Sequence, residues 1–79
     1  MRRPTPVVVD ETQRFELQHI VHSPTSPQRR VFRARLILLL AQGLSTEEVC
    51  RELTTSRVAV SRWRCRWAAS GLAGLEDAP

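Results

Sequence analysis

Apolar residues recur every three or four positions in four segments of this chain, which is the spacing of a helix that buries one face. The second segment is the most hydrophobic, because Leu36–Leu40 is apolar nearly all round, and we expect it to be the central helix of the core. The fourth segment places Val60, Trp63 and Trp67 on one stripe, so we expect both tryptophans to pack inward. The predicted helices are Glu11–Val21, Pro27–Gln42, Thr46–Leu53 and Arg57–Ser70.

Residues that start and end helices bound these segments. A short polar residue followed three positions later by Gln or Glu forms a capping box, and glycine after a helix favours its termination. Proline at the first helical position loses no hydrogen bond, since the N–H there has no partner within the helix. The expected caps are Asp10 with Gln13, Ser26 before Pro27, Ser45 with Glu48, and Ser56; the expected terminators are Gly43 and Gly71.

The length of 79 residues accommodates one small domain. We expect an all-α bundle over residues 10–71, preceded by a flexible N-terminal arm at 1–9 in which Val7–Val9 lies extended against the domain. Residues 72–79 are expected to form a C-terminal linker stub, a loose tail from which Leu72 and Leu75 fold back onto the core.

Positive charge is concentrated in particular helices. All 12 basic residues are arginine, which a GC-rich genome alone can explain, but their clustering needs another cause. Residues 28–40 hold four arginines and no acid, and residues 51–67 hold five arginines and one acid. Basic helices of this kind are typical of nucleic-acid binding or, less often, of binding to an anionic membrane surface. The arginines at 29, 30, 33 and 35 could contact phosphate or pair with Glu47, Glu48 or Glu52.

The short third helix, the Thr54-Thr55 link and the longer basic fourth helix have the arrangement of a helix-turn-helix. The face of the fourth helix opposite its tryptophans carries short side chains bordered by arginines, which suits base edges flanked by phosphates. The candidate DNA-binding residues are Ser56, Arg57, Val58, Ser61, Arg62, Arg64, Cys65, Arg29 and Arg30.

Other chemistries find little support. Cys50 and Cys65 are isolated, and neither they nor His19 and His22 have the spacing of metal ligands, so we expect free thiols and no metal or cofactor. No serine has the partners of a catalytic triad, and we expect no enzyme. The longest apolar run is too short to span a bilayer. We expect no membrane contact, and a cytoplasmic protein associated with the nucleoid when bound to DNA.

An ordered series of short motifs supports a more specific interpretation. Together they resemble the N-terminal DNA-binding region of bacterial insertion-sequence transposases of the mariner superfamily, over almost the whole chain. The motifs are Ser26-Pro27-Gln28-Arg29, Arg33-Ala34-Arg35, Gly43-Leu44-Ser45, Glu48-Val49, Ser56-Arg57, Val60-Ser61-Arg62-Trp63 and the Gly71–Pro79 segment with its two Gly-Leu pairs.

The resemblance implies a homeodomain-like helical domain of about four helices that binds the terminal inverted repeats of a transposon. Carried over by position, it implies that Ser56, Arg57, Ser61, Arg62 and Arg64 face the DNA. The relatives usually carry glycine in the turn where this chain has Thr54, so the turn is expected to be strained or differently shaped. Full-length relatives continue into a catalytic domain with an Asp/Glu triad, for which this chain has no place, so we expect no strand transfer by it.

Two alternatives stay open from the residues alone. One is a stand-alone transcriptional regulator with a helix-turn-helix, acting as a homodimer on a palindromic site. The other is a helical protein–protein module whose arginines only keep it in solution.

Overall fold

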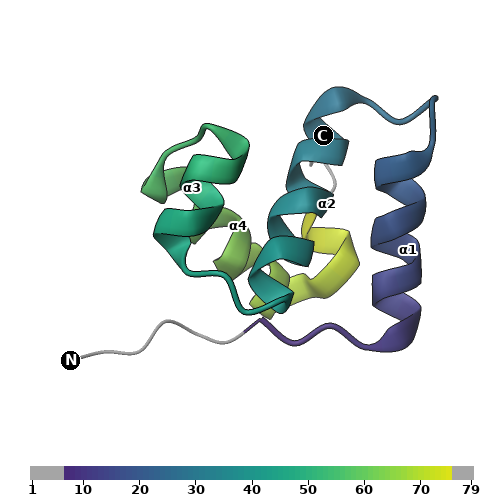
Figure 1. The fold of residues 1–79 in the computed structure, drawn as a ribbon. Helices are drawn as coiled ribbons and strands as arrows, with labels where there is room; N and C mark the ends of the chain where they lie inside the picture. Colours follow the sequence, from purple (N-terminus) through teal and green to yellow (C-terminus); the bar gives the residue numbers. More distant parts are fainter. Residues whose placement is uncertain (1–6, 76–79) are drawn as a thin grey trace.

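The computed structural model describes residues 7–75, and four α-helices with one 3₁₀ helix account for most of them (Figure 1). The prediction of a small all-α bundle is confirmed, and each helix begins and ends within one residue of its expected position. The elements are α1 Glu11–His22, α2 Gln28–Ala41, α3 Thr46–Leu53, α4 Arg57–Ser70 and the 3₁₀ helix η1 Gly71–Leu75.

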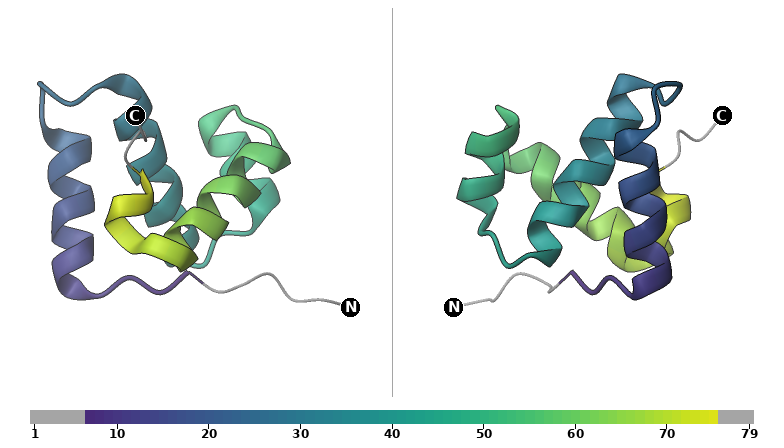
Figure 2. Two further views of the ribbon diagram at one scale, coloured as in Figure 1. Left: turned by 180° about the vertical axis from the view of Figure 1, so that it is seen from behind. Right: turned by 45° about the vertical axis from the view of Figure 1, so that its right-hand side comes forward.

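Helix α2 is the centre of the bundle, as its apolar run predicted. It contacts α1, α3, α4 and η1, and the two further views show these elements arranged around it (Figure 2). Leu36 and Ile37 are fully buried, and Leu38–Leu40 is half-buried against the core. Burying a leucine or isoleucine stabilises a fold by about 1.5–3 kcal/mol, so this helix contributes much of the folding free energy.

The core receives side chains from every element. The stripe of α1 faces inward as expected, while Phe15, which lies off that stripe, is 69% exposed. Both tryptophans of α4 pack against the core, Trp67 almost completely and Trp63 partly. The buried side chains are Leu17, Ile20, Ala34, Leu36, Ile37, Val49, Val60, Trp67 and Leu75.

The two expected capping boxes are both present. The Asp10 carboxylate accepts from the Gln13 backbone N–H, and the Gln13 side chain accepts from the Asp10 N–H. Ser45 and Glu48 make the same reciprocal pair at the start of α3. Because the Ser45 backbone N–H and hydroxyl favour the ionised form of Glu48, they lower the pKa of that carboxyl below its ordinary value.

The predicted start of α2 was wrong by one residue. Pro27 is the N-cap rather than the first helical residue, and its carbonyl accepts from the N–H groups of Arg30 and Val31. Its ψ of 144° is extended, which leaves Ser26 one position too far back to bond the first helical N–H groups. No side chain therefore caps this helix.

The predicted glycine termination of α2 is confirmed. Gly43 has a φ of 98°, which lies in the left-handed region. The Gly43 N–H bonds to the carbonyl of Leu40, and the Leu44 N–H bonds to the carbonyl of Leu39. These two bonds are the Schellman pattern, which turns the chain sharply from α2 toward Ser45 and fixes where α3 begins.

Thr54, in the turn between α3 and α4, also adopts the left-handed conformation, with a φ of 53°. It is the only residue other than glycine with a positive φ between residues 7 and 75. The N–H groups of Thr54 and Thr55 both bond to the carbonyl of Cys50. A β-branched side chain is disfavoured in this conformation, which accords with the expected strain at this position.

Segments on both sides of the expected domain, residues 10–71, pack against the core. Residues 72–75 are regular rather than loose, because they complete η1, and Leu72 and Leu75 fold back onto the core as expected. Arg33 donates from Nη1 to the Leu75 carbonyl at 3.0 Å. On the other side, the extended Val7–Val9 segment packs partly against the core, and the Trp67 indole N–H donates to the Val8 carbonyl at 3.0 Å.

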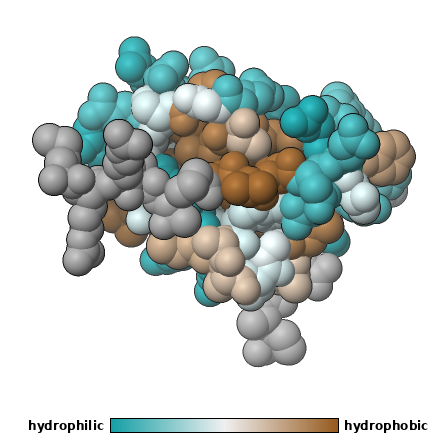
Figure 3. All heavy atoms as spheres, turned by 90° about the horizontal axis from the view of Figure 1, so that it is seen from below, coloured by the Kyte–Doolittle hydropathy of each residue, from teal (hydrophilic) through white to brown (hydrophobic). Residues whose placement is uncertain are grey.

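This extended segment runs along the underside of the bundle (Figure 1). Seen from below, hydrophobic side chains form a patch in the middle of the face, with hydrophilic side chains above it and to its right (Figure 3). The remainder of the expected N-terminal arm, residues 1–6, lies outside the described residues, as do residues 76–79.

Candidate nucleic-acid interface

The outward face of α4 carries a shallow hollow of about 490 Å³. Five side chains line it: the first residue of the helix and the residues one, four, five and eight positions after it. Residues at this spacing lie on one face of a helix. All five are exposed, and all are among the candidates from the sequence. The lining residues are Arg57, Val58, Ser61, Arg62 and Cys65.

The charge of α4 has one sign. The helix holds four arginines and no acidic residue over its 14 positions. The indole of Trp67 is buried on the inner side, while Arg57 and Arg62 are exposed on the outer side. An apolar inner stripe and a basic outer face are what a helix needs to pack on its own domain and meet an anionic partner.

The start of α4 is fixed by Ser56. Its side-chain oxygen accepts from the Ala59 backbone N–H, so the prediction that Ser56 caps this helix is confirmed. A hydroxyl that accepts one bond still has its own hydrogen to donate. Ser56 is exposed and lies directly beside Arg57, and therefore it can both cap the helix and donate to a phosphate oxygen.

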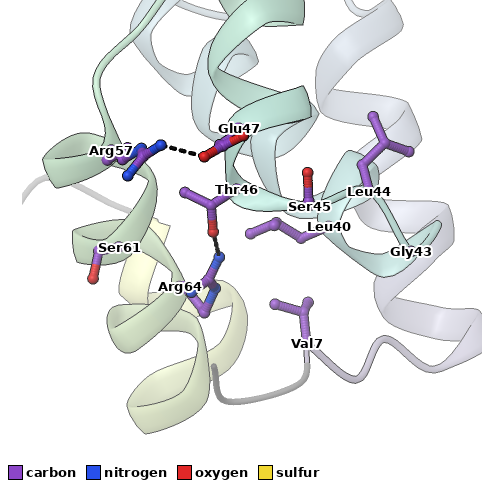
Figure 4. Close-up of a pocket in the computed structure, with 10 residues that line it drawn as sticks. All are labelled: Val7, Leu40, Gly43, Leu44, Ser45, Thr46, Glu47, Arg57, Ser61 and Arg64. Atoms are coloured by element: carbon purple, nitrogen blue, oxygen red, sulfur yellow. Dashed lines mark hydrogen bonds and ion pairs between the residues drawn. The ribbon is translucent and has the colours of Figure 1, made fainter. Parts of the chain in front are cut away.

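A larger hollow of about 680 Å³ lies between α4, the start of α3, the end of α2 and Val7 (Figure 4). Two arginines of α4 contact the first residues of α3 across it. Arg57 forms an ion pair with Glu47, and Arg64 donates from Nη2 to the Thr46 hydroxyl (Figure 4). These contacts join the first turn of α3 to the first residue and to the middle of α4.

The pair between Arg57 and Glu47 is open to solvent, with the two side chains 70% and 61% exposed. Exposed ion pairs contribute about 0–1 kcal/mol, since water competes with each partner. A phosphate or a guanine edge can therefore replace Glu47 at little energetic cost. The ion pair holds Arg57 beside the shallow hollow on the outward face of α4, and Arg57 stays able to bind an anionic ligand there.

The arginines of α2 lie apart from the shallow hollow on the outward face of α4. Arg29 and Arg30 stand in the first turn of the helix, exposed and half-buried respectively, and the lining of the hollow includes neither. Arg33 has a structural role, because it bonds to Leu75 and its guanidinium lies 4.2 Å from the centre of the Trp63 ring. Arg66 lies over the same ring at 5.1 Å.

Sequence reasoning did not assign Thr46 or Glu47 to this site. Glu47 was considered only as a partner for the arginines of α2, whereas the structure pairs it with Arg57. The tight Thr54-Thr55 link places the end of α3 beside the start of α4, and the long Arg57 side chain reaches back from there to Glu47 in the first turn of α3.

Other chemical features are few in the described part of the chain. Both cysteines are free thiols, Cys50 half-buried and Cys65 exposed, as expected. Residues 7–75 contain no group of three or more His, Cys, Asp or Glu side chains placed to hold a metal ion. None of the helices in this range has both the length and the hydropathy to cross a membrane.

A two-turn helix joined by a tight turn to a longer basic helix, both packed on a central helix, defines a helix-turn-helix domain. The chain matches a family model described as a homeodomain-like domain over residues 28–76, and it belongs to that family. Comparisons with curated proteins and with solved structures found no match. The family supports DNA binding as the function, and the helix-turn-helix prediction is confirmed.

Proposed function

We propose that this chain is the sequence-specific DNA-binding region of a transposase, and that its target is the terminal inverted repeat of an insertion sequence. The outward face of α4 carries the proposal, because it presents Arg57 and Arg62 on either side of one hollow. The motifs that resemble mariner-superfamily transposases, from the start of α2 through η1, supply the narrower assignment.

In this proposal α4 lies in the major groove, where each base pair displays a distinct set of donors, acceptors and methyl groups. Arg57 and Arg62 donate to guanine edges, and Ser56 and Ser61 make close polar contacts. Arg64 and the arginines at the start of α2, Arg29 and Arg30 among them, contact phosphates. The residues named here bind the DNA target, and the proposal gives none of them a catalytic role.

The test is binding of the full chain to the inverted repeat that flanks its reading frame, measured by fluorescence anisotropy against a scrambled duplex. Each guanine contact contributes about 1–3 kcal/mol of discrimination. Replacing both Arg57 and Arg62 with alanine should therefore reduce specific affinity at least about 30-fold. The matched control replaces Arg14 and Arg51, two exposed arginines outside the hollow, and removes the same charge.

Three results separate the competing functions. Equal loss in the two double variants means that α4 supplies charge but no sequence readout, which contradicts the proposal. A palindromic site with half-sites about one helical turn apart, bound by a homodimer, favours a transcriptional regulator. Absence of binding, or binding that added salt does not weaken, favours a protein–protein module.

A further inference from the structure

The hollow on α4 has an apolar centre. Val58 is 68% exposed there, although valine gains nothing from such exposure and is a weaker helix former than arginine, lysine, glutamine or glutamate. Cys65, two turns further along, borders the same hollow and is also exposed. The large exposed hydrophobic side chains among residues 7–75 are Val8, Phe15 and Val58, and Val58 alone of these lies on the face of α4 with the arginines.

Guanidinium groups flank this apolar centre. Arg57 precedes Val58 directly, and Arg62 follows it by one helical turn, so both reach the same hollow. A ligand that fits must present a small apolar group with negative charge or hydrogen-bond acceptors on both sides. In the major groove of DNA the C5-methyl group of thymine is such a group, since phosphates and acceptor atoms of neighbouring bases surround it.

We propose that this hollow recognises the C5-methyl group of a thymine, with Val58 as the contacting side chain and Cys65 as part of the wall. The inference rests on the proposed function, because it requires α4 in the major groove. Side chains one turn apart on a helix stand about 5–6 Å from each other, and successive bases of one strand are about 3.4 Å apart. Arg57 and Arg62 therefore reach the base pairs next to the thymine.

A second copy of this chain fits the hollow less well. In a symmetric contact the same patch meets itself, so the two copies would bring Arg57 and Arg62 against their equivalents. Four like charges around a small apolar contact repel, and DNA neutralises them instead.

The experiment begins with a binding site selected by the full chain from randomised duplexes. Each thymine in that site is then replaced in turn by deoxyuridine, which removes one methyl group and keeps every hydrogen-bonding atom. For the wild-type chain, one or two positions should lose about fourfold in affinity, the worth of one methyl group removed from water. At those positions Val58→Ala should show the same affinity for thymine and deoxyuridine.

Two further variants make the result specific. Val8→Ala makes the same change at another exposed valine and should keep the full deoxyuridine penalty. Val58→Thr keeps the shape but exchanges one methyl for a hydroxyl, and its penalty should lie between those of wild type and Val58→Ala. Because Val8 and Val58 are both exposed, we expect all three variants to fold, which the helical signal in circular dichroism checks.

The outcomes distinguish this inference from the proposed function. A selected site that needs Arg57 and Arg62 but tolerates deoxyuridine everywhere overturns the methyl contact and leaves sequence-specific binding in place. A deoxyuridine penalty that persists in Val58→Ala assigns the contact to another residue and overturns the role of Val58. Failure to select any site overturns both. A wild-type dimer that Val58→Ala abolishes, without DNA, overturns the inference in favour of a contact between copies.

Discussion

Replacing Thr54 with glycine should stabilise the domain, which is unusual for a change that removes a whole side chain. Thr54 is exposed and has a φ of 53°, so its side chain loses few contacts and its backbone is strained. Glycine adopts this conformation without the clash between Cβ and the carbonyl oxygen. The hydrogen bond from residue 54 to the Cys50 carbonyl uses the backbone and is kept.

The magnitude follows from two opposing effects. The left-handed conformation costs an L-residue about 1–2 kcal/mol, and glycine relieves this cost. Glycine also loses about 0.5–1 kcal/mol through its greater freedom in the unfolded chain. The net change is about 0.5–1 kcal/mol in favour of the variant, which corresponds to an increase in Tm of about 3–6 °C for a domain of this size.

The assay is thermal and urea unfolding of wild type, Thr54→Gly and Thr55→Gly. Thr55 is the matched control, because its φ is not positive and glycine there brings only the entropic loss. Thr55→Gly should therefore be less stable than wild type by about 0.5–1 kcal/mol. Two variants with the same loss of stability would refute the assignment of strain to Thr54.

Three further changes test other parts of the molecule. Leu75→Ala should cost about 2–4 kcal/mol of unfolding free energy, measured in urea, because the side chain is 1% exposed in the core. Glu48→Gln should weaken the fall in unfolding free energy at acid pH. The pKa of the Glu48 carboxyl is lower in the folded than in the unfolded chain, so its ionised form stabilises the fold above the unfolded pKa. This contribution disappears as the pH falls through the folded pKa. Glu47→Gln should raise DNA affinity at low salt, measured by fluorescence anisotropy, because it removes a negative charge beside Arg57 and frees that guanidinium to bond a guanine edge.

Helix positions followed from the sequence because the signals are local. A capping box such as that of Ser45 and Glu48 needs only residues three positions apart, and the left-handed turn at Gly43 needs only one residue. Where a local rule had two solutions, the prediction was wrong by a residue. Pro27 can follow an N-cap or be one, and its extended ψ decides for the second.

Contacts between distant residues were harder to predict. Arg33 was grouped with arginines that contact phosphate or pair with acids, but it bonds to a carbonyl 42 residues away and lies over Trp63. Only the packing of η1 against α2 and α4 brings that carbonyl within reach. Likewise, Glu47 joins the site because the long Arg57 side chain reaches back across the turn to the first turn of α3.

The hollow on the outward face of α4 could be predicted in part. Helical periodicity alone places Val58, Ser61 and Cys65 on one face, and the structure brings them together with two arginines. Arg64 belongs to the same set of candidates, and its guanidinium also donates to the Thr46 hydroxyl at the start of α3. A flank position on a helix leaves the direction of a long side chain open, and the neighbouring helix determines it.

If the outward face of α4 contacts DNA, the backbone amide chemical shifts of α4 change when DNA is added. The ¹⁵N-labelled chain is titrated with a selected duplex, and the shift of every backbone amide is followed. We predict that the largest changes fall on α4 at positions such as Arg57, Ser61 and Cys65, with smaller ones at the start of α3. Largest changes on the exposed face of α1, around Phe15 and His19, with α4 unaffected, would contradict the account.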